Sequence, residues 1–170
     1  MNRLPYRLLQ GAIAGTAATV AMTATARQLA RRLPARDRYP LPPREIIGAL
    51  RGEGRSVADP GRDEAGLANA TLIAHALFGA ATGALFALQQ RRGAGTGAAY
   101  GVTVWTASYF GWVPASGLLK PAHRHPLRRN LLMIAAHLVW GGTLALGLRQ
   151  IEGSVAGELR RGTEALPDLH

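Results

Sequence analysis

Residues 65–90 read AGLANATLIAHALFGAATGALFALQQ, and residues 93–119 read GAGTGAAYGVTVWTASYFGWVPASGLL. These stretches of 26 and 27 residues contain no Asp, Glu, Lys or Arg. A helix needs roughly 20 apolar residues to cross the hydrocarbon core of a bilayer, whereas a soluble amphipathic helix carries charges along its wet face. The two stretches therefore predict membrane-spanning helices.

Two further charge-free runs, residues 8–26 and 130–148, flank this pair. We therefore predict an all-α membrane protein with four transmembrane helices in a compact bundle and a short interfacial helix in the first loop. One domain, residues 1–150, holds the bundle, and residues 151–170 form a solvated tail. The spans are expected at about residues 8–28, 67–90, 95–117 and 130–149, and the interfacial helix at about residues 43–51.

The composition limits the classes of function. The chain has 20 Lys and Arg against 10 Asp and Glu, a net charge of +10. In a soluble protein this excess would indicate nucleic-acid binding, but here the arginines flank the spans, where anionic lipid headgroups lie. The expected partner is the lipid bilayer, and no nucleic acid is expected. No hydrolase triad, carboxylate dyad, P-loop or zinc-protease motif is present and there is no cysteine, so we predict neither catalytic residues nor a metal site.

The distribution of arginine predicts the orientation. Residues 27–64 contain nine Arg and residues 120–129 contain four Lys or Arg, against seven in the remaining segments combined. Because cytoplasmic loops are enriched in Lys and Arg, we expect these two loops in the cytoplasm and both termini outside. Cleavage of the first span as a signal peptide is disfavoured, because it would export a segment that begins with Arg27.

Small residues recur four positions apart on the predicted spans. Such faces allow helix backbones to approach closely, which is how helices associate in lipid. They can serve the interior of the bundle or a contact with a second copy or another membrane protein. The link at residues 91–93 is short, so it predicts spans two and three as antiparallel neighbours. The expected packing residues are Gly11, Gly15, Gly79, Gly83, Gly97, Gly101 and Gly141.

The first loop contains the predicted interfacial helix. After Pro42 and Pro43, which favour a helix start, the sequence continues REIIGALR. Its isoleucines and leucine are expected to enter the acyl boundary, while Arg44 and Arg51 contact lipid phosphates.

Spans two and four share the pattern Ala-His-x-x-aromatic-Gly-small, at His75 and His137. The two spans run in the same direction, so both imidazoles are expected at similar depth. Histidines within spans are functional candidates, and three interpretations stay open: structural hydrogen bonding, axial ligation of a b-type haem, or a proton or cation path. In the loop, His123 and His125 form a His-x-His pair, for which a solvated role is favoured over metal binding.

At Pro40-Leu41-Pro42-Pro43-Arg44, at His137-Leu138-Val139-Trp140 and at the histidine of span two, the chain resembles the YagU-like family of bacterial inner-membrane proteins. The likeness covers the four hydrophobic segments, although the first loop is shorter than in that family. The resemblance implies a bacterial inner-membrane location and no assigned chemistry. It also implies that Arg44, His75 and His137 share a site near one face of the membrane.

The sequence thus predicts a multi-pass inner-membrane protein of unassigned activity, a non-enzymatic membrane component or assembly partner. The alternatives are proton or small-solute transport through the bundle, and a haem b electron carrier with His75 and His137 as axial ligands.

Overall fold

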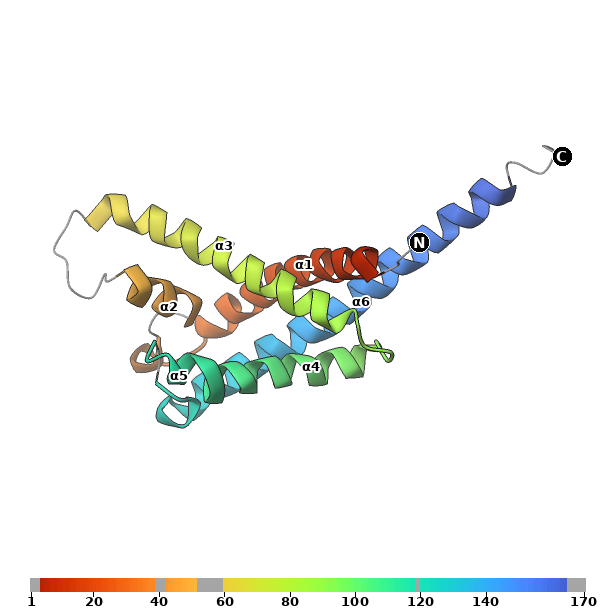
Figure 1. The fold of residues 1–170 in the computed structure, drawn as a ribbon. Coiled ribbons are helices and arrows are strands. Elements are labelled where there is room, and N and C mark those ends of the chain that lie inside the picture. Colours follow the sequence, from red (N-terminus) through yellow and green to blue (C-terminus); the bar gives the residue numbers. More distant parts are fainter. Residues whose placement is uncertain (1–3, 39–41, 52–59, 119, 165–170) are drawn as a thin grey trace.

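The computed structural model describes residues 4–38, 42–51, 60–118 and 120–164, and all the regular structure in these ranges is helical (Figure 1). This confirms the all-α prediction. The elements are α1 (Leu4–Ala30), η1 (Ala35–Asp37), α2 (Pro42–Arg51), α3 (Pro60–Phe86), α4 (Ala94–Thr106), η2 (Ala107–Trp112), α5 (Val113–Ala115), η3 (Ala122–Arg124) and α6 (Leu127–Glu164).

Among the described residues, three helices are long and apolar enough to cross a membrane. These are α1, the segment Ala65–Phe86 of α3 and the segment Leu127–Glu158 of α6. They support the prediction of a membrane protein. Helix α3 begins at Pro60, before the predicted start of span two, and α6 continues through the predicted tail to Glu164, while residues 165–170 lie outside the described part.

The third predicted span is divided. Helix α4 has 13 residues and passes into the π-helical turn η2 and then the short α5. The backbone leaves helical geometry at Gly111, with φ −105° and ψ −111°. Pro114 explains the position of the break, because a proline lacks an N–H and its ring crowds the carbonyl four residues earlier. The turn before Pro114 therefore widens, and glycine tolerates the distortion.

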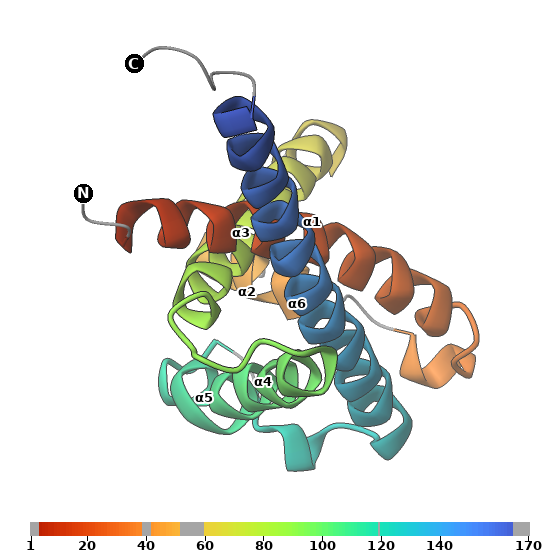
Figure 2. The ribbon, with the colours of Figure 1, turned by 90° about the vertical axis from the view of Figure 1, so that its right-hand side faces the viewer.

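The long helices contact one another in the order α3, α1, α6, α4 (Figures 1 and 2). Helices α3 and α4, predicted as antiparallel neighbours, have few backbone contacts with each other and meet through side chains. The Tyr100 hydroxyl donates to the carbonyl of Thr82 at 2.8 Å, and the Phe86 and Tyr100 rings lie 5.1 Å apart. The two helices are thus in contact, but each packs mainly against another helix. The reason is that each has a glycine face that fits a different helix. A short connection places the end of α3 near the start of α4. The glycine faces then determine which helix each of them packs against closely.

Two of these helix pairs, α1–α3 and α4–α6, cross at glycines. On α1, a Cβ added to Gly15 would overlap the carbonyl oxygen of Gly79 on α3, and one added to Gly11 would lie 2.7 Å from Ala87 Cβ. On α4, a Cβ at Gly97 would overlap the carbonyl oxygen of Gly141 on α6. The predicted packing residues therefore lie at the α1–α3 and α4–α6 crossings, where the backbones touch.

The end of the bundle near Phe86 is closed. Phe86, Leu144 and Leu148 are each fully buried there. Above them, the guanidinium of Arg7 donates to the carbonyl of Ala87 at 2.7 Å, and Arg92 forms an ion pair with Glu152 at 2.7 Å. This end holds packed apolar side chains beneath a polar cap.

Candidate interhelical site

The opposite end of the bundle is hollow. A cavity of about 280 Å³ lies between α1, α2, α3, η2 and α6. Its lining is almost wholly apolar, and the residues in it that carry polar groups are His75, Ser108, Tyr109, Trp112 and His137. The lining residues from α3 and α6 are Ala74, His75, Phe78, Met133 and His137. The two predicted histidines thus face one cavity, although they lie on different helices.

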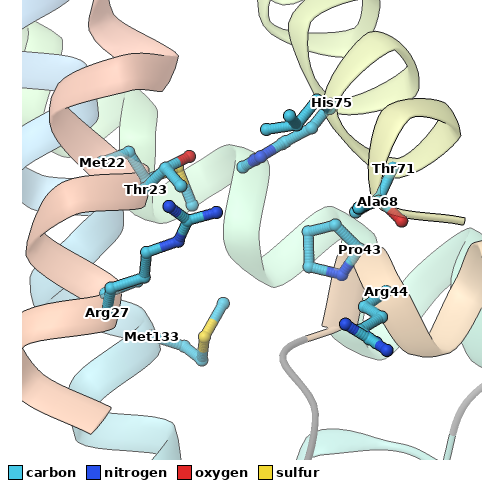
Figure 3. Close-up of a pocket in the computed structure, with 11 residues that line it drawn as sticks. Met22, Thr23, Arg27, Pro43, Arg44, Ala68, Thr71, His75 and Met133 are labelled. Atoms are coloured by element: carbon cyan, nitrogen blue, oxygen red, sulfur yellow. The ribbon is translucent and has the colours of Figure 1, made fainter. Parts of the chain in front are cut away.

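A second cavity of about 240 Å³ adjoins the first and shares Met22, Pro43, His75 and Met133 with it. Its other lining includes Arg27 and Arg44. Figure 3 shows Arg27 extending from α1 and His75 extending from α3 toward each other across this space, with Arg44 at its lower edge. We call the two cavities together the interhelical site. The second one contains the arginines and is named the polar compartment, although most of its lining is apolar, and the first is named the apolar compartment.

His137 is held in one tautomer. Its ring is 8% exposed, and Nδ1 lies 2.7 Å from the carbonyl oxygen of Met133, one turn earlier on α6. A carbonyl only accepts, so Nδ1 carries the hydrogen, and in the neutral ring Nε2 is left as an acceptor. This arrangement suits a ligand that donates a hydrogen bond, and it is also the one that metal-bound histidines adopt.

Helix α2 covers the site. Pro42, Pro43, Ile46, Ile47 and Leu50 line the apolar compartment from this side. An ion pair joins this helix to α6: Arg129 Nη2 at the start of α6 donates to Glu45 Oε1 at 3.3 Å, and the Arg129 side chain is only 3% exposed. Figure 1 shows α2 beside the first half of α3, at the end of the molecule away from both termini.

Burial raises the pKa of Glu45, and the charges of Arg129 and His125 oppose this effect without cancelling it. A carboxyl whose pKa is raised on docking favours the docked state below its ordinary pKa and disfavours it as the pH rises through the raised value. Docking of α2 should therefore weaken as the pH rises from the ordinary pKa of a glutamate through the raised value.

Glu45→Gln should remove the free-energy cost of burying an ionised carboxylate when α2 docks. We expect the variant to keep or raise the melting temperature at pH 7, and to lose the gain that the wild type shows on acidification through the raised pKa. Thermal unfolding in detergent at a series of pH values measures both effects. Glu158→Gln is the matched control, because the Glu158 side chain is 71% exposed. A melting temperature that falls sharply in Glu45→Gln at pH 7 would show that the ion pair outweighs the burial.

Arg51 is the other predicted headgroup contact, and His123 and His125 form the pair for which a solvated role was favoured. Arg51 ends α2, and its side chain lies outside what the structure describes. His123 is exposed, while His125 Nε2 lies 3.1 Å from the carbonyl of Lys120. In the described ranges no three His, Cys, Asp or Glu side chains gather where they could hold a metal ion.

Sequence reasoning missed Arg27 as a site residue, because it was counted with the headgroup-facing arginines of the first loop. It also missed Met22, Tyr109, Trp112 and Met133 as lining. The available signal was that Met22 and Arg27 occupy the last turns of span one, level with the start of span four.

No family model, curated protein or solved structure matches this chain.

Proposed function

We propose that this protein is a non-enzymatic component of the bacterial inner membrane that crosses it four times and holds a membrane-derived apolar or amphipathic molecule in the interhelical site. The main support for the proposal is the interhelical site itself. The bundle is hollow at its basic end, where this site lies, and is closed by packed side chains at the other end. The inner-membrane location rests on the resemblance to the YagU-like family and on the arginine distribution.

Three of the four proposed crossings are the candidate spans in α1, α3 and α6. The remaining crossing is the third predicted span, formed by α4, η2 and α5. It covers residues 94–115 without a charge, which at 1.5 Å per residue is about 33 Å of helix. It packs along α6, itself a candidate span. Partial unwinding at Gly111 is compatible with a crossing because irregular backbone at membrane depth is tolerated where it lines a cavity, and Ser108, Tyr109 and Trp112 line this one.

Binding is favoured over transport because the described part of the bundle offers no path onward from the site. Toward the far end, the glycine crossings bring the backbones together, and the fully buried Phe86, Leu144 and Leu148 fill the space beyond. A proton or ion path needs polar side chains or water along its length. We therefore expect no proton flux through the purified protein in liposomes, measured with an internal pH dye.

The second candidate is the haem b electron carrier. The observation that favours it is the Nδ1 hydrogen bond of His137, which leaves Nε2 available for iron. The reduced-minus-oxidised visible spectrum of protein expressed with haem precursor decides the question. An α band that is lost in both His75→Ala and His137→Ala would establish haem, and a colourless protein would remove this candidate.

The four-crossing topology is testable with single cysteines because the chain has none of its own. Suitable exposed positions are Arg36, Gln90, His123 and Ser154. A membrane-impermeant maleimide should label Arg36→Cys and His123→Cys only in inverted vesicles, and Gln90→Cys and Ser154→Cys only in intact spheroplasts. If Gln90→Cys and His123→Cys react from the same side, the segment at residues 94–115 does not cross and the proposal fails.

A further inference from the structure

We propose that the molecule in the interhelical site is a phospholipid of the cytoplasmic leaflet. Its phosphate is bound by Arg27 and Arg44, and one acyl chain enters the apolar compartment beneath α2. This inference rests on the proposed function, since it names the chemical class of the ligand. The two compartments match the two halves of an amphiphile, and their order places the charged half at the basic end of the bundle.

The polar compartment has the chemistry of a phosphate site. Arg27 and Arg44 line it from different helices, and the Thr23 hydroxyl beside them donates to the carbonyl of Thr19 at 2.7 Å, which leaves the two arginines as the donors for a ligand. Among the residues that the structure describes, no Asp or Glu lines either compartment, and Glu45 is paired with Arg129. Within the described part of the chain, the Arg27 guanidinium makes no ion pair or hydrogen bond. Guanidinium groups suit phosphate because their parallel N–H groups bind two of its oxygens at once.

The apolar compartment distinguishes a lipid from free phosphate. It continues directly from the polar one past His75 and Met133, which line both. Its walls are aliphatic and aromatic side chains such as Ile46, Ile47 and Trp112. Inorganic phosphate would leave this space empty, whereas an acyl chain would fill it. The total volume falls in the range of about 300–1,000 Å³ that ligand sites show.

The position in the membrane agrees with this occupant. The site lies where α1 ends and α6 begins, among the arginines of the two loops assigned to the cytoplasm. The phosphates of the cytoplasmic leaflet lie at this level, and basic residues next to spans attract them.

Photo-crosslinking of full-length protein in nanodiscs tests the assignment. One nanodisc preparation contains phosphatidylglycerol with a diazirine at the end of one acyl chain, and the other contains the matching diacylglycerol, which has no phosphate. Adducts are mapped by mass spectrometry of peptides. We expect the phosphatidylglycerol probe to label residues 42–50 and 108–113, which line the apolar compartment, and the diacylglycerol probe to label them at least about tenfold less, as the loss of a charge-assisted hydrogen bond predicts.

Arginine variants provide the second comparison. Arg27→Gln/Arg44→Gln should reduce labelling by phosphatidylglycerol about tenfold. Arg31→Gln/Arg36→Gln should not, because both residues are exposed and line neither compartment. Melting temperatures verify that the variants fold, and the comparison of the two probes on wild-type protein needs no variant at all.

The outcomes separate this inference from the function on which it rests. Equal labelling by both probes would overturn the phosphate assignment and leave an apolar binding cavity in place. Loss of labelling on addition of millimolar inorganic phosphate would assign the arginines to the free ion and overturn the lipid. The absence of any adduct in the lining segments, with either probe, would overturn both proposals.

Discussion

Gly141→Ala should destabilise the folded bundle by about 1–3 kcal/mol or more, the usual cost of overpacking a tight contact, while Gly142→Ala on the same helix should leave it unchanged or slightly more stable. At Gly141 the added Cβ would overlap the carbonyl oxygen of Gly97 and lie 3.0 Å from the backbone nitrogen of Gly101. These are backbone atoms of α4, so no side chain can move aside.

The neighbouring position supplies the control. No atom lies within 4 Å of a Cβ added at Gly142, and alanine is favoured over glycine inside a helix by roughly 0.5–1 kcal/mol. Titration of the folded protein with SDS, followed by far-UV circular dichroism, gives both changes in free energy. If the two variants unfold at the same SDS fraction, then α4 and α6 are not in backbone contact in the micelle, and the crossing is wrong.

The glycine pattern shows how far sequence reasoning reached for the fold. Spacing by four residues identified faces for close approach, and the structure places those glycines at two crossings. The choice of partner could not be predicted, because a glycine face fits any helix of similar profile. The short link at residues 91–93 favoured α3 with α4, yet Gly79 and Gly83 fit against Gly15 and Gly11 instead.

For the site, sequence repetition was the useful signal. The shared pattern around His75 and His137 selected two side chains that line one cavity. The other features of the site depend on contacts between segments that are distant in the sequence. Arg129 and Glu45 are 84 positions apart in the sequence, and nothing in either local pattern indicates that they pair. Arg27 was misjudged for a related reason, since a basic residue at the end of a span looks the same whether it faces headgroups or a cavity.

The division of the third predicted span has a local cause that the sequence contains. Pro114 and Gly111 were both visible, and a kink near Pro114 could be expected from the missing N–H. Its form, a π-helical turn over residues 107–112, depends on what the widened turn faces. Here it places Ser108, Tyr109 and Trp112 on the cavity, so the break that interrupts the span also lines the proposed ligand site.

Trp140→Ala should be among the most destabilising single changes in the chain, at about 3–5 kcal/mol, the cost of truncating a buried tryptophan. Its side chain is 3% exposed, and its ring lies 6.0 Å from that of Tyr100 on α4, with 28° between the planes. The indole Nε1 donates to the Thr19 hydroxyl on α1 at 3.2 Å. One side chain on α6 thus joins both neighbouring helices.

Trp140→Phe separates the two contributions. It keeps most of the ring and removes the N–H, so the expected loss is only about 1 kcal/mol, the net value of one hydrogen bond. Thr19 stays satisfied without the indole, because its hydroxyl also donates to the carbonyl of Gly15 at 2.9 Å. Leu138→Ala, two residues away at a position 42% exposed, should cost less than Trp140→Ala. Equal losses for Trp140→Ala and Leu138→Ala, measured by SDS titration with circular dichroism, would mean that α6 does not pack between α1 and α4, because only that placement buries Trp140 and leaves Leu138 at the surface.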